Sequence, residues 1–216
     1  MKFKIDFKIF LFLVLFYFTK QIDRYVLIII FAFIHELGHL FVGILLGMKP
    51  NKIELMPYGL SISFNIVPKD FNKKIKNGNI MELKKIMVAL AGPVVNAILI
   101  ILFINYRVEN SLEYIYSNLL LLLFNLLPIY PLDGGRVLKG LLHIKFGKRK
   151  AEKYMNVISY ISMLIITAIS SILILQLKNI SVFIIIIVLW GLVYKEEKYL
   201  RRKNKIYDLI EKSIEI

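Results

Sequence analysis

Six apolar segments constrain the fold of this 216-residue chain more than any other feature of its sequence. A helix needs roughly 20 residues, each adding about 1.5 Å, to cross the hydrocarbon core of a bilayer. The first and last segments are marginal by this measure, and the other four are adequate. The segments span residues 5–19, 26–48, 86–105, 114–132, 155–177 and 180–194. They predict an all-α polytopic membrane protein with about six transmembrane helices.

Composition agrees with this fold class, and the length of the chain favours a single membrane domain. Hydrophobic residues make up 58% of the chain and charged residues 20%, whereas soluble domains are roughly 45–50% apolar. The first segment follows three lysines, as in a signal peptide, but ends in Tyr17, Phe18, Thr19 and Lys20 without a small-residue cleavage site. We therefore expect it to be a membrane helix. One membrane domain should occupy residues 1–194, followed by a basic cytoplasmic tail helix over 195–216.

The formal net charge of +14 is explained by topology. With six spans, all of the 29 basic residues except Lys20, Arg24, Arg107 and Lys178 fall on one side of the membrane. Basic residues concentrate on the cytoplasmic side of membrane proteins. The pattern predicts cytoplasmic termini, some attraction to anionic lipid, and no nucleic-acid partner.

Residues 60–66 change to the period of a strand. Apolar side chains alternate there with Ser61, Ser63 and Asn65, after a Pro-Tyr-Gly turn. We expect a short membrane-associated β-hairpin between the second and third helices. It is either an ordinary surface hairpin or an edge that pairs with an extended peptide, in which case Ser61, Ile62 and Ser63 contact the substrate.

The second apolar segment contains the motif His-Glu-x-x-His at His35, Glu36 and His39. On a helix these three residues share one sector, since His39 lies about 40° from His35. Two histidines one turn apart can bind one metal ion, and the neighbouring glutamate can reach a water on it. The alternative is a pair of core histidines with a satisfied glutamate. Because titratable groups are costly inside a span, the metal site is favoured.

A catalytic zinc site usually has a third protein ligand. The chain has no cysteine, which leaves His143 and Asp133 as the main candidates. His143 lies among lysines and is expected to be solvated at the interface. Asp133 follows Pro128 and Pro131, which break the fourth helix short of the cytoplasmic edge. Irregular backbone can then carry Asp133 to nearly the depth of His39, beside a water-accessible pocket.

The third segment contains Gly92, Pro93 and Asn96. Gly92 and Pro93 can serve close packing or a kink. Asn96 either forms a hydrogen bond between helices or faces the active pocket, and the sequence does not decide between these roles.

The stretches FIHELGHL, AGPVVNA and NLLPIYPLDGGR together resemble the motif set of the site-2 protease family of intramembrane zinc metalloproteases. The resemblance implies that His35, His39 and Asp133 bind one zinc ion per chain and that Glu36 is the general base. It also places Asn125 in the motif that contains the aspartate.

The motif order and the MPYG turn most resemble the sporulation branch of that family, whose type member processes a membrane-tethered pro-sigma factor. This resemblance implies a pro-sigma substrate, inhibitory membrane protein partners, and a bacterial cell membrane such as the one surrounding the forespore. Members of the branch often continue into a cystathionine-beta-synthase-type domain. The sequence ends about twenty residues after the last span, so we expect no such domain and no nucleotide regulation through it.

The sequence therefore predicts regulated intramembrane proteolysis by a zinc metalloendopeptidase. The alternative is a non-catalytic membrane scaffold, or a metal or proton carrier that uses the same midplane residues. A carrier is expected to continue its polar groups toward the far side of the membrane. The fifth segment offers only neutral hydroxyls, including Ser159 and Ser170, which can bond to their own helix.

Overall fold

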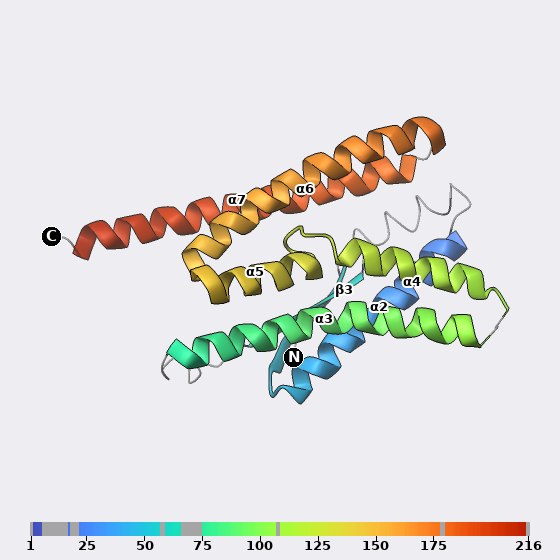
Figure 1. The fold of residues 1–216 in the computed structure, drawn as a ribbon, viewed down its shortest axis with the longest axis horizontal. Helices are drawn as coiled ribbons and strands as arrows, with labels where there is room; N and C mark the ends of the chain where they lie inside the picture. The colour runs from blue at the N-terminus through green and yellow to red at the C-terminus, as the bar shows by residue number, and fades with distance from the viewer. Residues whose placement is uncertain are drawn as a thin grey trace. The chain divides into compact units, whose positions relative to one another are not determined.

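The computed structural model divides the chain into two units, Met1–Leu126 and Leu127–Ile216 (Figure 1). It describes residues 2–5, 17, 22–56, 59–65, 75–106, 109–177 and 180–214. The first unit contains β1 (Lys2–Ile5), α2 (Ile22–Leu45), β2 (Lys49–Met56), β3 (Gly59–Asn65), α3 (Ile75–Asn105) and α4 (Ser111–Asn125). The second contains α5 (Asp133–Phe146), α6 (Lys148–Leu177) and α7 (Ile180–Ile214).

Helix α2 has two apolar faces with different partners. Its buried face packs on α3 and α4, where Phe31 and Ala32 meet Leu121. The Phe31 ring lies 5.9 Å from the rings of both Phe103 and Tyr114, in edge-on contacts typical of aromatic pairs. The opposite face exposes large apolar side chains at helical spacing, which suits contact with lipid rather than water. These are Ile30, Phe33, Leu37, Phe41 and Ile44.

Among the described residues, three helical stretches are long and apolar enough to cross a membrane: Ile22–Leu45, Asn79–Asn105 and Lys148–Ser171. They correspond to the second, third and fifth predicted segments. The first predicted segment, 5–19, lies outside the described residues except for Ile5, which belongs to β1, and Tyr17. The fourth is shorter than expected, because α4 ends at Asn125. Six spans therefore remain a prediction.

A three-stranded sheet of order β1-β2-β3 packs against α2. β1 runs parallel to β2, and β2 runs antiparallel to β3 with a register shift between Pro50 and Lys52. The pairing of β1 with β2 brings residues 2–5 to the segment that follows α2. The charge pattern assigned these two parts of the chain to the same side of the membrane.

The second unit is built on two long helices, α6 and α7, which lie side by side (Figure 1). Both helices contain buried apolar side chains: Ala151, Met155 and Met163 in α6, and Leu189, Val193 and Leu200 in α7. α7 runs without a break from the last apolar segment through the basic tail to Ile214. An ion pair joins the charged parts of the two helices, with Lys203 Nζ 2.5 Å from Glu152 Oε1.

Candidate metal centre

His35 and His39 lie on the buried face of α2, and each is 3% exposed. Their Nε2 atoms are 3.1 Å apart, with the ring centroids at 4.8 Å. Two nitrogen ligands of a tetrahedral zinc ion, each about 2.0–2.1 Å from the metal, lie roughly 3.3 Å from one another. The spacing of the two imidazoles therefore fits a shared metal ion, as the motif predicts.

The neighbouring helix α3 contacts Nδ1 of His39 and favours one tautomer of its ring. Its Nδ1 lies 2.6 Å from the carbonyl oxygen of Val88. The backbone N–H of Gly92 also lies 3.3 Å from this Nδ1. The contact with Val88 is the shorter of the two and a carbonyl can only accept a hydrogen bond, so the geometry favours a proton on Nδ1 and a lone pair on Nε2. This is the tautomer in which His39 presents Nε2 to a metal.

Gly92 of α3 provides the space at the two donor nitrogens. A Cβ atom at this position would lie 2.5 Å from Nε2 of His39 and 2.6 Å from Cε1 of His35. Such contacts are too short for any residue other than glycine, so α3 can approach the histidines only because residue 92 has no side chain. Sequence reasoning assigned Gly92 to packing or a kink and missed this contact with both imidazoles.

Glu36 follows His35 on α2 and is half-buried. It is thus more accessible than the two histidines, which suits a group that exchanges protons with water. Its assignment as general base rests on the motif and remains a prediction.

Asp133 belongs to the second unit, where it is the first residue of α5 and 4% exposed. The sequence placed it on irregular backbone, but that backbone covers only residues 126–132 and Asp133 is helical. The amino terminus of a helix favours a charged carboxylate, as a metal ligand must be. Arg136 Nη1 lies 3.5 Å from Oδ1 of Asp133 and reaches outward to solvent.

The sharp turn before α5 depends on Gly135. A Cβ at this residue would lie 2.5 Å from the backbone nitrogen of Tyr130 and would also collide with the carbonyl group of Ile129. Ile129 is fully buried. The glycine pair was expected to permit an irregular turn, whereas Gly135 instead lets the first turn of α5 pack directly on the preceding backbone.

His143 lies ten residues after Asp133 on α5, or about 15 Å along the helix axis. The two side chains therefore cannot bind the same ion. His143 is half-buried in the last turn of the helix, near the predicted basic interface.

The apolar stretches of α3 and α4 contain asparagine side chains, among them Asn96, Asn118 and Asn125. Asn96 is fully buried, and neither atom of its amide has a hydrogen-bond partner among the described residues. Asn125 donates from Nδ2 to the carbonyl of Leu121 at 3.0 Å, within its own helix. Asn118 was not singled out from the sequence, although it too is fully buried in an apolar segment, and its Oδ1 has no partner among the described residues.

The predicted strand around Ser61–Ser63 lies in β3. Ser61, Ile62 and Ser63 are paired in register with Glu54, Ile53 and Lys52 of β2. A Cβ at Gly43 of α2 would lie 2.5 Å from Cε1 of Phe64, so the ring of Phe64 sits directly on the α2 backbone. This contact anchors β3 one helical turn beyond His39.

Comparison with known proteins gives a consistent result. The sequence model of Peptidase family M50 matches residues 105–169, a segment that contains Asp133 but not the two histidines. A zinc metalloprotease of Methanocaldococcus jannaschii is 31% identical over 138 residues, covering 60% of this chain and 37% of that protein. Stage IV sporulation protein FB of Bacillus subtilis is 25% identical over 141 residues, covering 62% of this chain and 46% of that protein.

The chain thus spans less than half the length of these two curated relatives. The solved structure of a site-2 protease from Methanocaldococcus jannaschii is similar over 91% of both chains, with a TM-score of 0.66 and 25% identity. The family model, the two relatives and the solved structure together support the site-2 protease family of zinc metalloproteases, peptidase family M50.

Proposed function

We propose that this chain is an intramembrane zinc metalloprotease, which hydrolyses a peptide bond in or near the membrane segment of a protein substrate. The observation that carries the proposal is the pair of buried imidazoles on a lipid-facing helix. Their Nε2 atoms are 3.1 Å apart, and Gly92 leaves space beside them. Packing alone gives no reason for this arrangement inside an apolar helix.

Asp133 is the proposed third ligand. Catalytic zinc sites take three protein ligands and leave one position open, and this chain has no cysteine to supply one. Asp133 is a buried carboxylate at a helix amino terminus, within the segment that matches the family model. Arg136, whose Nη1 lies 3.5 Å from Oδ1 of Asp133, is itself exposed to solvent. A bound cation would balance the buried charge of the carboxylate.

Bound zinc would supply Lewis acidity, which polarises the scissile carbonyl and makes water a better nucleophile near neutral pH. The carboxylate of Glu36 accepts the proton from the attacking water and later delivers it to the leaving amine. The Val88 carbonyl holds the His39 ring in the ligating tautomer throughout. Asn96, buried and without a partner in the described residues, is the proposed polar contact to the substrate backbone.

Substrate presentation is the proposed role of β3. A membrane helix hides its backbone in hydrogen bonds, so it must unwind before cleavage. β3 is the last strand in the order β1-β2-β3, and Phe64 anchors it to the helix that holds both histidines. Pairing of an extended substrate with its outer edge, near Ser61–Ser63, would stabilise the unwound form.

The substrate class is a membrane-tethered protein. The likeness to the sporulation protein of Bacillus subtilis makes a pro-sigma factor the first candidate to test, with inhibitory membrane proteins as partners. The location proposed with it is a bacterial membrane, such as the one surrounding the forespore, with both termini cytoplasmic. The archaeal zinc metalloprotease is the more identical of the two relatives, so the family is supported more strongly than this branch.

The test compares the wild type with Glu36→Gln in proteoliposomes that contain the candidate substrate. General acid-base catalysis is worth about 10²- to 10⁴-fold, so cleavage should fall by that factor while the zinc content stays the same. Glu113→Gln is a matched control, because Glu113 is exposed in the first turn of α4. Retained cleavage in the Glu36 variant refutes the assignment of the base. Metal flux without proteolysis would favour a carrier instead.

A further inference from the structure

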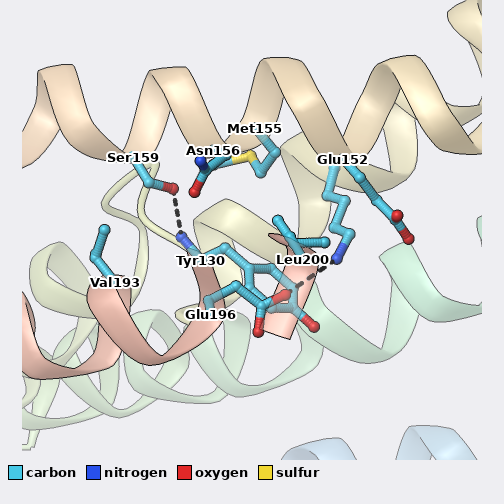
Figure 2. A pocket seen from close by; sticks show the side chains of 9 residues that line it. Tyr130, Glu152, Met155, Asn156, Ser159, Val193, Glu196 and Leu200 are labelled. Carbon is cyan, nitrogen blue, oxygen red and sulfur yellow. Dashed lines mark hydrogen bonds and ion pairs between the residues drawn. The ribbon is translucent and has the colours of Figure 1, made fainter. Parts of the chain in front are cut away.

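The second unit contains a small cavity between α5, α6 and α7, beside the turn that leads into Asp133 (Figure 2). Its polar lining consists of Tyr130, Lys139, Glu152, Asn156, Ser159 and Glu196. These residues have no part in the chemistry proposed above. Two of them contact the turn itself, and those contacts connect the cavity with the proposed metal ligand.

Tyr130 is held from two sides. Its backbone N–H donates to Oγ of Ser159 on α6 at 3.1 Å, and Ser159 is only 2% exposed (Figure 2). The ammonium group of Lys139 on α5 lies 3.9 Å from the centre of the Tyr130 ring. The hydrogen bond fixes the backbone of the turn, and the cation-π contact fixes its side chain.

Lys139 is in turn held by α7. Its Nζ lies 3.7 Å from Oε1 of Glu196, and both side chains are about three-quarters covered. Burial lowers the pKa of Lys139, and burial raises the pKa of Glu196. Glu152, which also lines the cavity, forms a second ion pair with Lys203. Each charge therefore depends on its neighbours, and removal of one partner leaves another charge poorly compensated.

The turn transmits these restraints to Asp133. The N–H of Leu132 donates to the carbonyl of Ile129 at 2.8 Å, and Gly135 packs against the backbone of Ile129 and Tyr130. Asp133 follows Tyr130 by three residues, and the hydrogen bond of the turn and the close packing of Gly135 restrain the backbone between them. A displacement of Tyr130 therefore shifts the carboxylate as well.

We propose that Ser159 and Lys139 are positioning residues for Asp133, which orient its carboxylate toward zinc by holding the 129–132 turn. This inference rests on the proposed role of Asp133 as a zinc ligand. Residues that hold a metal ligand in place without binding the metal typically contribute about 10- to 100-fold to metal affinity. Ser159 and Lys139 are assigned that role without touching the metal themselves.

The test measures the zinc dissociation constant of the purified full chain by competition with a chelator, and the visible spectrum of the Co²⁺-loaded protein. Ser159→Ala and Lys139→Met should each weaken zinc binding about 10- to 100-fold and change the Co²⁺ spectrum. Lys139→Arg, which keeps a cation near Tyr130 and Glu196, should restore both. A loss of packing alone would not be rescued in this way.

Two controls match the variants. Ser170→Ala removes another buried serine hydroxyl from α6, about three helical turns from Ser159. Lys145→Met removes another lysine of α5, whose ammonium group lies 5.2 Å from the centre of the Phe146 ring and not near Tyr130. Both should leave zinc affinity and the Co²⁺ spectrum unchanged, and an equal loss in either control overturns the inference.

Asp133→Asn separates this inference from the proposed function. If it binds zinc as tightly as the wild type, the proposed ligand set fails. If Asp133→Asn weakens binding while Ser159→Ala and Lys139→Met do not, the ligand set stands and the positioning role fails.

Discussion

Substitution of Gly92 by alanine should close the metal site. The new Cβ would lie 2.5 Å from Nε2 of His39 and 2.6 Å from Cε1 of His35, whereas ordinary contacts begin at 3.4 Å. Both imidazoles, or the helix that holds them, must therefore move by about 0.8–0.9 Å, well beyond the roughly 0.2 Å tolerance of zinc-ligand distances. The loss in zinc affinity should be at least about 100-fold, by analogy with the effect of 1 Å misplacements in active sites.

The same substitution should not damage the helix itself. Alanine is favoured over glycine in a helix interior by about 1 kcal/mol, so α3 should form at least as well in the variant. Circular dichroism should show unchanged helix content, while chelator competition in detergent shows the loss of zinc binding. This combination separates a blocked site from a misfolded protein.

Gly191→Ala is the matched control for this experiment. Gly191 also lies inside a helix, but a Cβ there would meet no atom within 4 Å. Zinc affinity should be unchanged and stability slightly raised. Wild-type zinc affinity in the Gly92 variant would refute the placement of the metal beside the two histidines.

Three further predictions follow from single contacts. Gly43→Ala, which forces Phe64 off α2, should lower peptide cleavage without changing zinc content, and Phe64→Leu should recover part of the rate. Gly135→Ala should reduce zinc affinity and thermal stability together, because the collision is with the backbone of Ile129, which cannot yield cheaply. Burial raises the pKa of Glu196 above its ordinary value of 4.5. The protonated side chain therefore stabilises the fold below pH 4.5, and this contribution to the free energy of unfolding is lost as the pH rises through the folded-state pKa. The melting temperature of Glu196→Gln relative to the wild type should therefore increase over that pH range, and a constant difference would contradict this reading.

The parts of the site that depend on local sequence were predictable. The 3.6-residue period places His35 and His39 on one face whatever surrounds the helix. Pro128 and Pro131 were expected to end the fourth helix, because proline removes a backbone donor and disfavours helical geometry in the preceding residue. α4 indeed ends at Asn125, and α5 begins at Asp133.

The contacts between distant segments were not predictable. Gly92 meets the histidines of α2 more than fifty residues earlier in the chain, and Ser159 meets a backbone N–H twenty-nine residues away. A glycine or serine in an apolar segment has many possible partners, and the sequence alone gives no register between helices. The continuation of α7 to Ile214 was missed for a different reason. The change from apolar to charged residues was read as a boundary, although a helix can cross it without a break.

The zinc-edge X-ray absorption spectrum of the purified wild-type protein tests the central claim most directly. The account predicts one zinc ion per chain, with two imidazole rings and oxygen ligands at about 2.0–2.2 Å. A protein that binds no zinc, or a spectrum without imidazole scattering, would contradict the account.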